Sequence, residues 1–266
     1  MRTFHLTFAT RGRQPVAPDE SIRRALVRVI VRVAGISLVL FCVVDDHVHV
    51  VVLCTREVAG RLAQSLVLAL RGASPVPVRA ADITPVNSRP HMVELLRYVL
   101  TQSEHHGLAA PAALWSGSCF PDLVGARVIE GWRYNIREAL PRFRRRDAYV
   151  AVGLPAEPLE PVSIARVREL GAWRLAEAAA GAVGVGPTLI GRAAPVVAAR
   201  RVVVQLGLHA GIGPSEIGAA LELTRWGVSR LGAGPSPAAE VRATRLRLAL
   251  EDAVVRLPMR LGAAAG

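Results

Sequence analysis

Residues 43–53 read VVDDHVHVVVL, and this stretch sets the topology expected for the N-terminal half of the chain. Valine-rich runs on both sides of two aspartates are typical of two strands joined by a turn. We therefore expect a hairpin, with strands near 36–44 and 47–54 and the turn at Asp45 and Asp46. The hairpin also has to accommodate two histidines in a segment that is otherwise apolar.

His47 and His49 should project from the same face of the second strand, because successive side chains on a strand alternate between faces. Two imidazoles on one face, about 7 Å apart along the strand, can converge on one metal ion. The alternative is one histidine buried in the core and the other exposed to solvent. Two histidines do not complete a coordination shell, so a metal site needs a further ligand.

The segments around the hairpin predict the element order β-α-β-β-α-β followed by a helix. The expected elements are a strand at 3–10, helices at 21–33 and 56–71, an extended segment at 75–86 and a helix at 91–106. This order is that of a split βαβ, ferredoxin-like antiparallel sheet. We expect an α+β domain of this type over residues 1–125, with Asp19 or Ser21 capping its first helix.

The rest of the chain predicts a second, all-helical unit. A strongly basic helical segment at 127–146 and the Pro-rich AVGLPAEPLEPVS predict a helix and linker over residues 126–162. Residues 163–258 have an Ala-rich helical pattern, and residues 259–266 form a tail. At 266 residues the chain is long enough for two such domains.

A candidate third ligand lies in ELLRYVLTQSEHHG. Tyr98 and Gln102 are four residues apart, so on a helix they lie on the same face. Tyr98 could instead be a core aromatic residue of an amphipathic helix, and Gln102 a solvated polar residue. The pairing of His-x-His with Tyr-x-x-x-Gln is more informative than either motif alone.

In combination, these motifs resemble the HUH single-tyrosine transposases of the insertion-sequence type and their REP-associated relatives. Those relatives carry a strand, a Pro/Asp-x-His-x-His element, an RYIxxNPxxxGL-like helix and a Trp-Ser pair, in that order. The corresponding segments are TFHLTFATRGRQPV, VVDDHVHVVV, LLRYVLTQSEHHGL and WSGSCFPDLVG, which together span residues 3–125.

The resemblance implies a DNA strand-transfer chemistry. His47, His49 and Gln102 would bind a divalent ion, Mg²⁺ or Mn²⁺, and Tyr98 would be the nucleophile. Cleavage of single-stranded or hairpin DNA would leave a 5′-phosphotyrosine and a free 3′-hydroxyl. A catalytically inactive or host-adopted DNA-binding protein with the same fold is the competing hypothesis. A replication or mobilisation initiator would need a helicase or a second catalytic tyrosine, which the sequence does not suggest.

The sequence departs from the family pattern in two places. The segment between His49 and Tyr98 is short and has no Gly-x-x-Trp-x-x-Arg-like stretch, so the strand at 75–86 could be truncated. The family's NPVRAGL-like run is QSEHHGL here, which introduces His105 and His106. We expect these two histidines to be solvated at the end of the helix.

The segment GPSEIGAALELTRWGVSRL predicts a helix-turn-helix, with Ser215 and Thr224 as helix caps. Residues 174–232 resemble the DNA-binding domain of the chromosomal replication initiator, although that family's recognition signature is replaced here by LTRWGV at 223–228. The resemblance implies duplex DNA as a partner. A helical bundle without DNA contact is the alternative. The residues expected to reach DNA from the second helix are Arg225, Trp226 and Arg230.

The composition favours a polyanionic partner. The formal net charge is +12, and all 33 lysine-or-arginine positions are arginine, which binds phosphate in a bidentate manner. A second basic cluster expected to contact DNA comprises Arg133, Arg137, Arg142, Arg144, Arg145 and Arg146. Three cysteines in apolar surroundings and the absence of an apolar signal core predict a cytoplasmic protein without a membrane span. Whether the protein is a monomer or a homodimer stays open.

Overall fold

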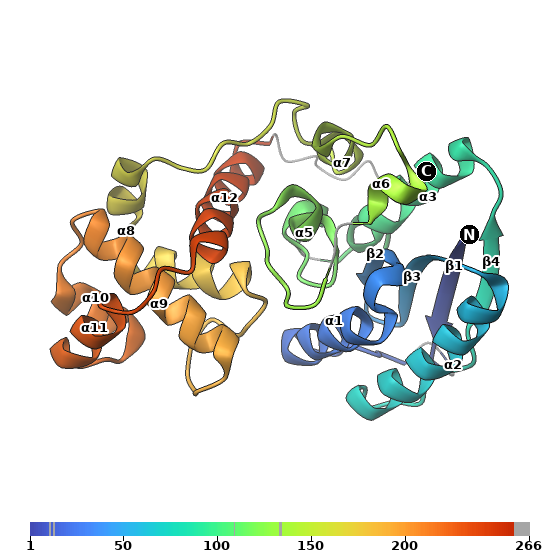
Figure 1. Cartoon of the computed structure of the whole chain (residues 1–266), viewed down its shortest axis with the longest axis horizontal. Coiled ribbons are helices and arrows are strands. Elements are labelled where there is room, and N and C mark those ends of the chain that lie inside the picture. The colour runs from blue at the N-terminus through green and yellow to red at the C-terminus, as the bar shows by residue number, and fades with distance from the viewer. Residues whose placement is uncertain (11, 13, 109, 133–134, 258–266) are drawn as a thin grey trace.

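A computed structural model describes residues 1–10, 12, 14–108, 110–132 and 135–257 of the chain. The N-terminal half is built on a four-stranded antiparallel sheet of order β2-β3-β1-β4 (Figure 1). Its elements are β1 (Arg2–Ala9), α1 (Glu20–Ala34), β2 (Leu38–Val43), β3 (His47–Cys54), α2 (Arg56–Ala73) and β4 (Asp82–Val86). The mixed α+β class expected from the sequence is confirmed.

The hairpin expected from residues 43–53 forms between β2 and β3. Cys42 lies opposite His49 in its register, and the amide N–H of Val44 donates to the carbonyl of His47 at 3.1 Å. β1 pairs with the other edge of β3, which places Thr7 opposite His49. The histidine strand is therefore central in the sheet, with hydrogen-bonded neighbours on both sides.

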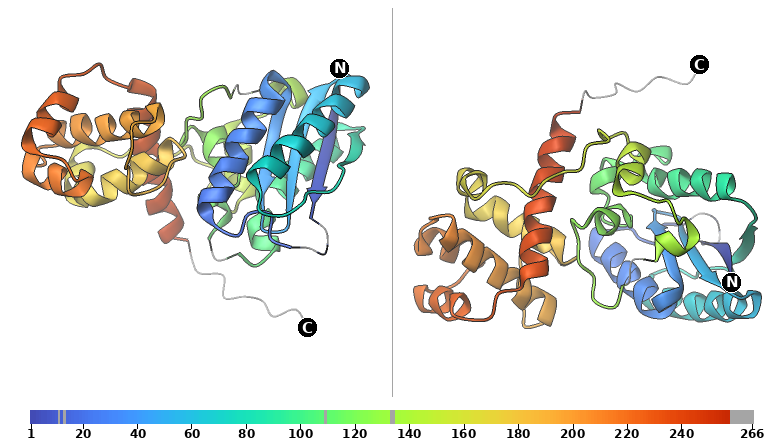
Figure 2. Two further views of the ribbon diagram at one scale, coloured as in Figure 1. Left: turned by 90° about the horizontal axis from the view of Figure 1, so that it is seen from below. Right: turned by 45° about the horizontal axis from the view of Figure 1, so that its top comes forward.

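The two faces of the sheet differ in chemistry. Phe4, Leu6 and Phe8 alternate along β1 with His5 and Thr7, and the three apolar residues are at most 3% exposed. Helices α1 and α2 lie side by side over one face, and α3 (Arg89–Leu100) lies on the other (Figures 1 and 2). The apolar residues of β1 face α1 and α2, and the histidines face α3. Burial of each large apolar side chain contributes roughly 1.5–3 kcal/mol to stability.

Side-chain caps begin the helices that flank the sheet. Asp19, not Ser21, caps α1 by accepting the amide N–H of Ile22 at 2.9 Å. Ser88 caps α3 by accepting the amide N–H of His91 at 3.2 Å, and Pro90 lies in the first turn. These caps satisfy amide groups that have no partner within a helix, so they fix where α1 and α3 begin.

The single helix expected at 91–106 is interrupted. α3 ends at Leu100, and a short helix α4 (Gln102–His105) follows after Thr101, whose backbone is not helical (φ −102°, ψ 10°). The Thr101 hydroxyl donates to the carbonyl of Arg97 at 2.9 Å, a side-chain bond that competes with regular helix geometry. β4 is shorter than the extended segment expected at 75–86, and Pro85 is accommodated because β4 is an edge strand.

The segment that begins just before the Trp-Ser pair packs against the sheet. It contains η3 (Ala112–Leu114), α5 (Phe120–Val124), α6 (Ile136–Ala139) and α7 (Arg145–Ala151). Among the described residues, the expected basic helix at 127–146 is therefore two short helices with an irregular connection. Three large side chains of this segment are at most 4% exposed and belong to the same core as the sheet, namely those of Ile136, Phe143 and Tyr149. Much of this segment is thus part of the N-terminal core.

Buried polar contacts hold the loop that follows η3. The indole N–H of Trp115 donates to the carbonyl of Val43 at 2.8 Å, which ties the loop to β2. Arg127 forms a two-pronged ion pair with Asp122, and both side chains are at most 3% exposed. The guanidinium of Arg127 also donates to the carbonyls of Ser116 and Ser118.

The C-terminal half is helical and has its own core. Its elements are α8 (Ile164–Ala182), which is kinked at Gly171, α9 (Ala194–His209), α10 (Pro214–Leu221), α11 (Arg225–Gly232) and α12 (Ala238–Val255). The cap expected at Thr224 is confirmed, since its hydroxyl accepts the amide N–H of Gly227 at 3.2 Å. The cap expected at Ser215 is not found, because α10 begins one residue earlier, after Gly213.

Helix α12 lies between the two halves of the molecule (Figures 1 and 2). Leu248 is buried in the C-terminal core, whereas Leu246 and Leu250 are buried in the core that contains the sheet. All three cysteines are buried and unpaired. Within the described part of the chain, no helix has the length and apolar character needed to cross a membrane.

Candidate metal and tyrosine site

Three nitrogen and oxygen atoms converge on the α3 face of the sheet. Nε2 of His47 lies 2.7 Å from Nε2 of His49, and the same His49 atom lies 3.1 Å from Oε1 of Gln102. The two histidines come from the start of β3, and Gln102 begins α4. The structure thus brings together the three residues for which the sequence predicted metal ligation.

The other ring nitrogen of each histidine has its own partner. Nδ1 of His47 lies 2.6 Å from a carboxylate oxygen of Asp46, and Nδ1 of His49 lies 2.9 Å from Nε2 of His5. A neutral imidazole carries one N–H and one lone pair. We assign the N–H groups to Nδ1, donating to Asp46 and His5, which leaves the lone pairs of the two neighbouring Nε2 atoms available for one ion. Histidines that bind metals are commonly oriented in this way.

Gln102 is held with its side-chain oxygen toward the histidines. Its side-chain NH₂ donates to the backbone carbonyl of Tyr98 at 3.0 Å, so its Oε1 faces the histidines. The residue is fully buried, at 0% exposure. The interruption of the helix at Thr101 separates Tyr98 and Gln102 onto two short helices, yet the amide contact keeps them adjacent.

The protonation states agree with this arrangement. Burial, assisted by the neighbouring imidazoles, lowers the pKa of His49 to about 3, and burial lowers the pKa of His5 to about 4. Burial acts to raise the pKa of Asp46, but the hydrogen bond to His47 and the charge interactions with His47 and His106 together outweigh it, and the net pKa is lower than usual. At neutral pH, His5 and His49 are therefore uncharged and Asp46 is a carboxylate.

Tyr98 stands beside this cluster and is open to solvent. Its ring centroid lies 5.3 Å from that of His49 and 6.4 Å from that of His5, and the residue is 45% exposed. A core aromatic residue at this position would be buried instead. The exposed ring is accessible to a substrate as large as a nucleic acid.

The donor set fits a divalent ion. Atoms that bind one ion at about 2.1 Å lie about 3 Å apart when their bonds are perpendicular. Nε2 of His49 lies at similar distances, 2.7 and 3.1 Å, from Nε2 of His47 and Oε1 of Gln102. The described residues contain no group of three or more His, Cys, Asp or Glu side chains placed to hold a metal. The fit therefore depends on the amide oxygen of Gln102 in addition to the two imidazoles.

Two further residues of the site were not predicted from the sequence. Asp46 was interpreted only as a turn residue, although its position directly before His47 could have suggested a partner for Nδ1. His5 could be found only from the pairing of β1 with β3. The two histidines at the end of α4 are exposed, as expected, but they border the site. The ring centroid of His106 lies 4.8 Å from that of His47, and that of His105 lies 6.4 Å from that of Tyr98.

The arginines expected to bind DNA lie in two separate regions. Arg137 is exposed on α6, and Arg144 and Arg145 are exposed where α7 begins, whereas Arg133 is outside the described residues. On α11, Trp226 is 70% exposed and the guanidinium carbon of Arg230 lies 5.4 Å from the centre of its ring. Helices α10 and α11 are at the end of the molecule farthest from the sheet (Figure 1).

Comparison of the chain with protein-family models, with curated proteins and with solved structures gave no match.

Proposed function

We propose that this protein is a metal-dependent DNA strand transferase that cleaves single-stranded or hairpin DNA with Tyr98 as the nucleophile. The observation that supports the proposal best is the convergence of two imidazole lone pairs and an amide oxygen beside an exposed tyrosine. Each ligand has a hydrogen-bonding partner that orients it. Such support is characteristic of metal sites.

In the proposed reaction, Tyr98 is the nucleophile and the three ligand residues hold the ion. The Tyr98 oxygen forms a bond to the phosphorus of a phosphodiester, and the bond from phosphorus to the 3′-oxygen breaks. The proton lost by the phenol is balanced by the proton gained by the leaving 3′-hydroxyl. A divalent ion held by His47, His49 and Gln102 would polarise the phosphate and offset the charge that develops on it. The 5′-phosphotyrosine can then be attacked by another 3′-hydroxyl, which gives strand transfer.

The topology supports the same proposal. We propose a ferredoxin-like sheet, a fold whose elements run in the order β-α-β-β-α-β. The elements here have that order, with the sheet order β2-β3-β1-β4, and the histidines lie on a central strand of the hairpin. We propose that this is the HUH type of the fold, because the tyrosine helix packs on the histidine face.

We propose that the helical C-terminal half binds duplex DNA. Helices α10 and α11 are joined by three residues, which is helix-turn-helix spacing. The exposed pair of Trp226 and Arg230, together with Arg225 at the start of α11, lies where a recognition helix contacts bases or phosphates.

The decisive test uses random-sequence single-stranded DNA that carries a fluorophore at either its 3′ or its 5′ end. After incubation with Mn²⁺ or Mg²⁺, a denaturing gel should show the 3′ label migrating with the protein and the 5′ label migrating free. Tyr98→Phe should bind the DNA and form no adduct. His47→Ala should form none at any Mn²⁺ concentration that restores the chelated wild type.

Two outcomes would contradict the proposal. An adduct formed by Tyr98→Phe would exclude Tyr98 as the nucleophile, and full cleavage by the wild type in excess chelator would exclude a metal. DNA binding by the wild type without any adduct would favour the competing hypothesis of an inactive or host-adopted DNA-binding protein.

A further inference from the structure

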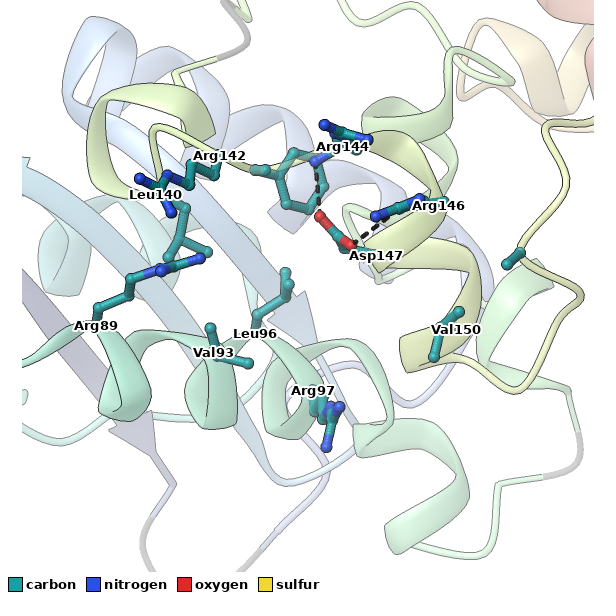
Figure 3. Close-up of a pocket in the computed structure, with 12 residues that line it drawn as sticks. Arg89, Val93, Leu96, Arg97, Leu140, Arg142, Arg144, Arg146, Asp147 and Val150 are labelled. Atoms are coloured by element: carbon teal, nitrogen blue, oxygen red, sulfur yellow. Dashed lines mark hydrogen bonds and ion pairs between the residues drawn. The ribbon is translucent and has the colours of Figure 1, made fainter.

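An arginine-rich pocket lies on the other side of the tyrosine helix from the sheet's central strands. It has a volume of about 520 Å³ and opens between α3 and the segment at 140–150, which contains most of α7 (Figure 3). The residues that line its charged part are Arg89, Arg97, Arg142, Arg144, Arg146 and Asp147. Sequence reasoning grouped three of these arginines by proximity along the chain, but Arg89 and Arg97 join them only through the fold.

The charges in this pocket are not balanced by the protein. Among the described residues that line it, Asp147 is the only one with a carboxylate. Asp147 accepts the backbone N–H of Arg144 at 2.7 Å and lies 3.9 Å from the Arg146 guanidinium. Within the described part of the chain, no salt bridge is formed by Arg89, Arg97, Arg142 or Arg144. Like charges gathered around one cavity repel each other unless an anion occupies it.

The floor of the pocket is apolar. Val93 and Leu96 line it from α3, and Leu140 and Phe143 line it from the segment before α7. Val150 of α7 is half exposed at its edge. An apolar floor beneath guanidinium groups suits a nucleotide unit, because the sugar and base can lie on the floor while the phosphates reach the arginines.

The position of the pocket indicates which part of a nucleic acid would occupy it. Arg97 directly precedes Tyr98, and Arg89, Val93 and Leu96 lie along the same helix (Figure 3). A strand whose scissile phosphate is at Tyr98 reaches this pocket if it continues over the surface of α3. Single-stranded DNA is flexible enough to turn into a pocket there, and a rigid duplex is not.

We propose that this pocket binds the sugar–phosphate backbone of the single-stranded DNA segment adjacent to the scissile phosphate. The proposal rests on the proposed function, since it takes Tyr98 as the point of cleavage. The arginines contact phosphates and the apolar floor contacts sugar or base without reading sequence. Binding at the pocket therefore holds the strand in place for attack by Tyr98.

The test measures binding in the Tyr98→Phe background, where no covalent bond can form. Fluorescence anisotropy is recorded with a labelled oligothymidylate at several salt concentrations. The double variant Arg97→Ala/Arg144→Ala removes two pocket arginines, and Arg61→Ala/Arg168→Ala removes two exposed arginines elsewhere as the matched control. Loss of two phosphate contacts should reduce the salt slope by about 1.4 units, at roughly 0.7 for each contact.

We expect the pocket variant to bind the oligothymidylate about tenfold more weakly or worse, and the control variant to bind it nearly as the parent does. Equal weakening by both variants would show only a general effect of charge and would overturn the proposal. A labelled nucleoside triphosphate serves as a second probe. If the pocket variant lost the triphosphate but kept the oligonucleotide, the pocket would be a free-nucleotide site and the proposal would be wrong.

The design separates this inference from the proposed function. Covalent adduct formation is measured independently on the wild type. If no adduct forms but the pocket variant still loses oligonucleotide binding, the strand-transfer chemistry fails and the binding site stands. If adducts form and the pocket variant binds the oligonucleotide normally, the strand-transfer chemistry stands and the proposed binding site is wrong.

Discussion

His49 is only 2% exposed, and it contacts His5, His47 and Gln102 through its two ring nitrogens. A buried imidazole with this environment stays neutral in the folded protein to low pH, whereas the unfolded chain takes up its proton near pH 6.5. The stabilising effect is therefore present above pH 6.5 and is lost as the pH falls toward the folded-state pKa of about 3.

The first prediction follows from this linkage. In metal-free buffer, the free energy of unfolding should fall between pH 7 and pH 5 in the wild type. In His49→Gln this fall should be smaller by about 2 kcal/mol. Urea denaturation of both proteins at the two pH values measures the difference. Carboxylates contribute equally to both proteins in this range, so parallel pH dependences would show that His49 is not buried in its neutral form.

The second prediction concerns Asp46. Asp46→Asn should bind Mn²⁺ about 10- to 100-fold more weakly than the wild type, because the carboxylate no longer fixes the His47 ring and increases its basicity. Isothermal titration calorimetry measures the affinity, and Asp45→Asn on the same turn is the control. An unchanged affinity in Asp46→Asn would show that the contact between Asp46 and His47 has no part in metal binding.

Residue-level prediction succeeded where periodicity alone determined the geometry. Alternation along a strand put His47 and His49 on one face, and helical spacing put Tyr98 near Gln102. His5 was missed because its approach to His49 depends on the register between β1 and β3, and that register results from packing of the whole sheet.

Among the elements, α5 is attached to the neighbouring loop through the buried pair of Asp122 and Arg127. Breaking such a pair leaves one charge buried without a partner. Breaking an exposed pair leaves both groups in water, as for Arg166 and Glu169, whose side chains are 39% and 64% exposed. The two pairs should therefore respond very differently to the same kind of substitution.

The third prediction compares these pairs directly. Asp122→Ala should lower the free energy of unfolding by about 3–5 kcal/mol, whereas Glu169→Ala should change it by less than about 1 kcal/mol. Chemical denaturation of the two variants gives both values. Similar losses in the two variants would mean that the interaction of Arg127 with Asp122 is not shielded from water.

Element boundaries were predicted less well than element types. The break at Thr101 depends on a hydroxyl that bonds to the carbonyl of Arg97, and no periodicity in the sequence marks it. The basic segment at 127–146 has helical composition, but Ile136 packs into the sheet's core from α6 and Phe143 from the connection between α6 and α7. Tertiary packing determined these boundaries, and local preference did not.

For the molecule as a whole, α12 connects two cores. Leu248 and Leu250 lie two residues apart on it and are at most 1% exposed, but they are buried in different cores. A division into domains at residues 125 and 162 could be proposed from composition, because Pro-rich sequence precedes residue 162, and it stays a prediction. The return of the last helix to the first core could not, because it depends on contacts between distant parts of the chain.

The fourth prediction uses this pair of leucines. Each change to Ala should cost about 2–5 kcal/mol locally. Native-state hydrogen exchange should show faster exchange of the β1 and β3 amides in Leu250→Ala and faster exchange of the α8 and α9 amides in Leu248→Ala. The same pattern of exchange in both variants would mean that the two cores unfold as one unit.

The proposed chemistry is tested most directly by locating the covalent bond. Wild-type protein is incubated with Mn²⁺ and random-sequence single-stranded DNA, and the adduct is digested with nuclease and trypsin. Tandem mass spectrometry then identifies the modified peptide. Tyr98, Tyr134 and Tyr149 fall in different tryptic peptides because arginines separate them. We expect a nucleotide attached through its 5′-phosphate to Tyr98 alone. Attachment to Tyr134 or Tyr149, or to a residue other than tyrosine, would contradict the assignment of this site.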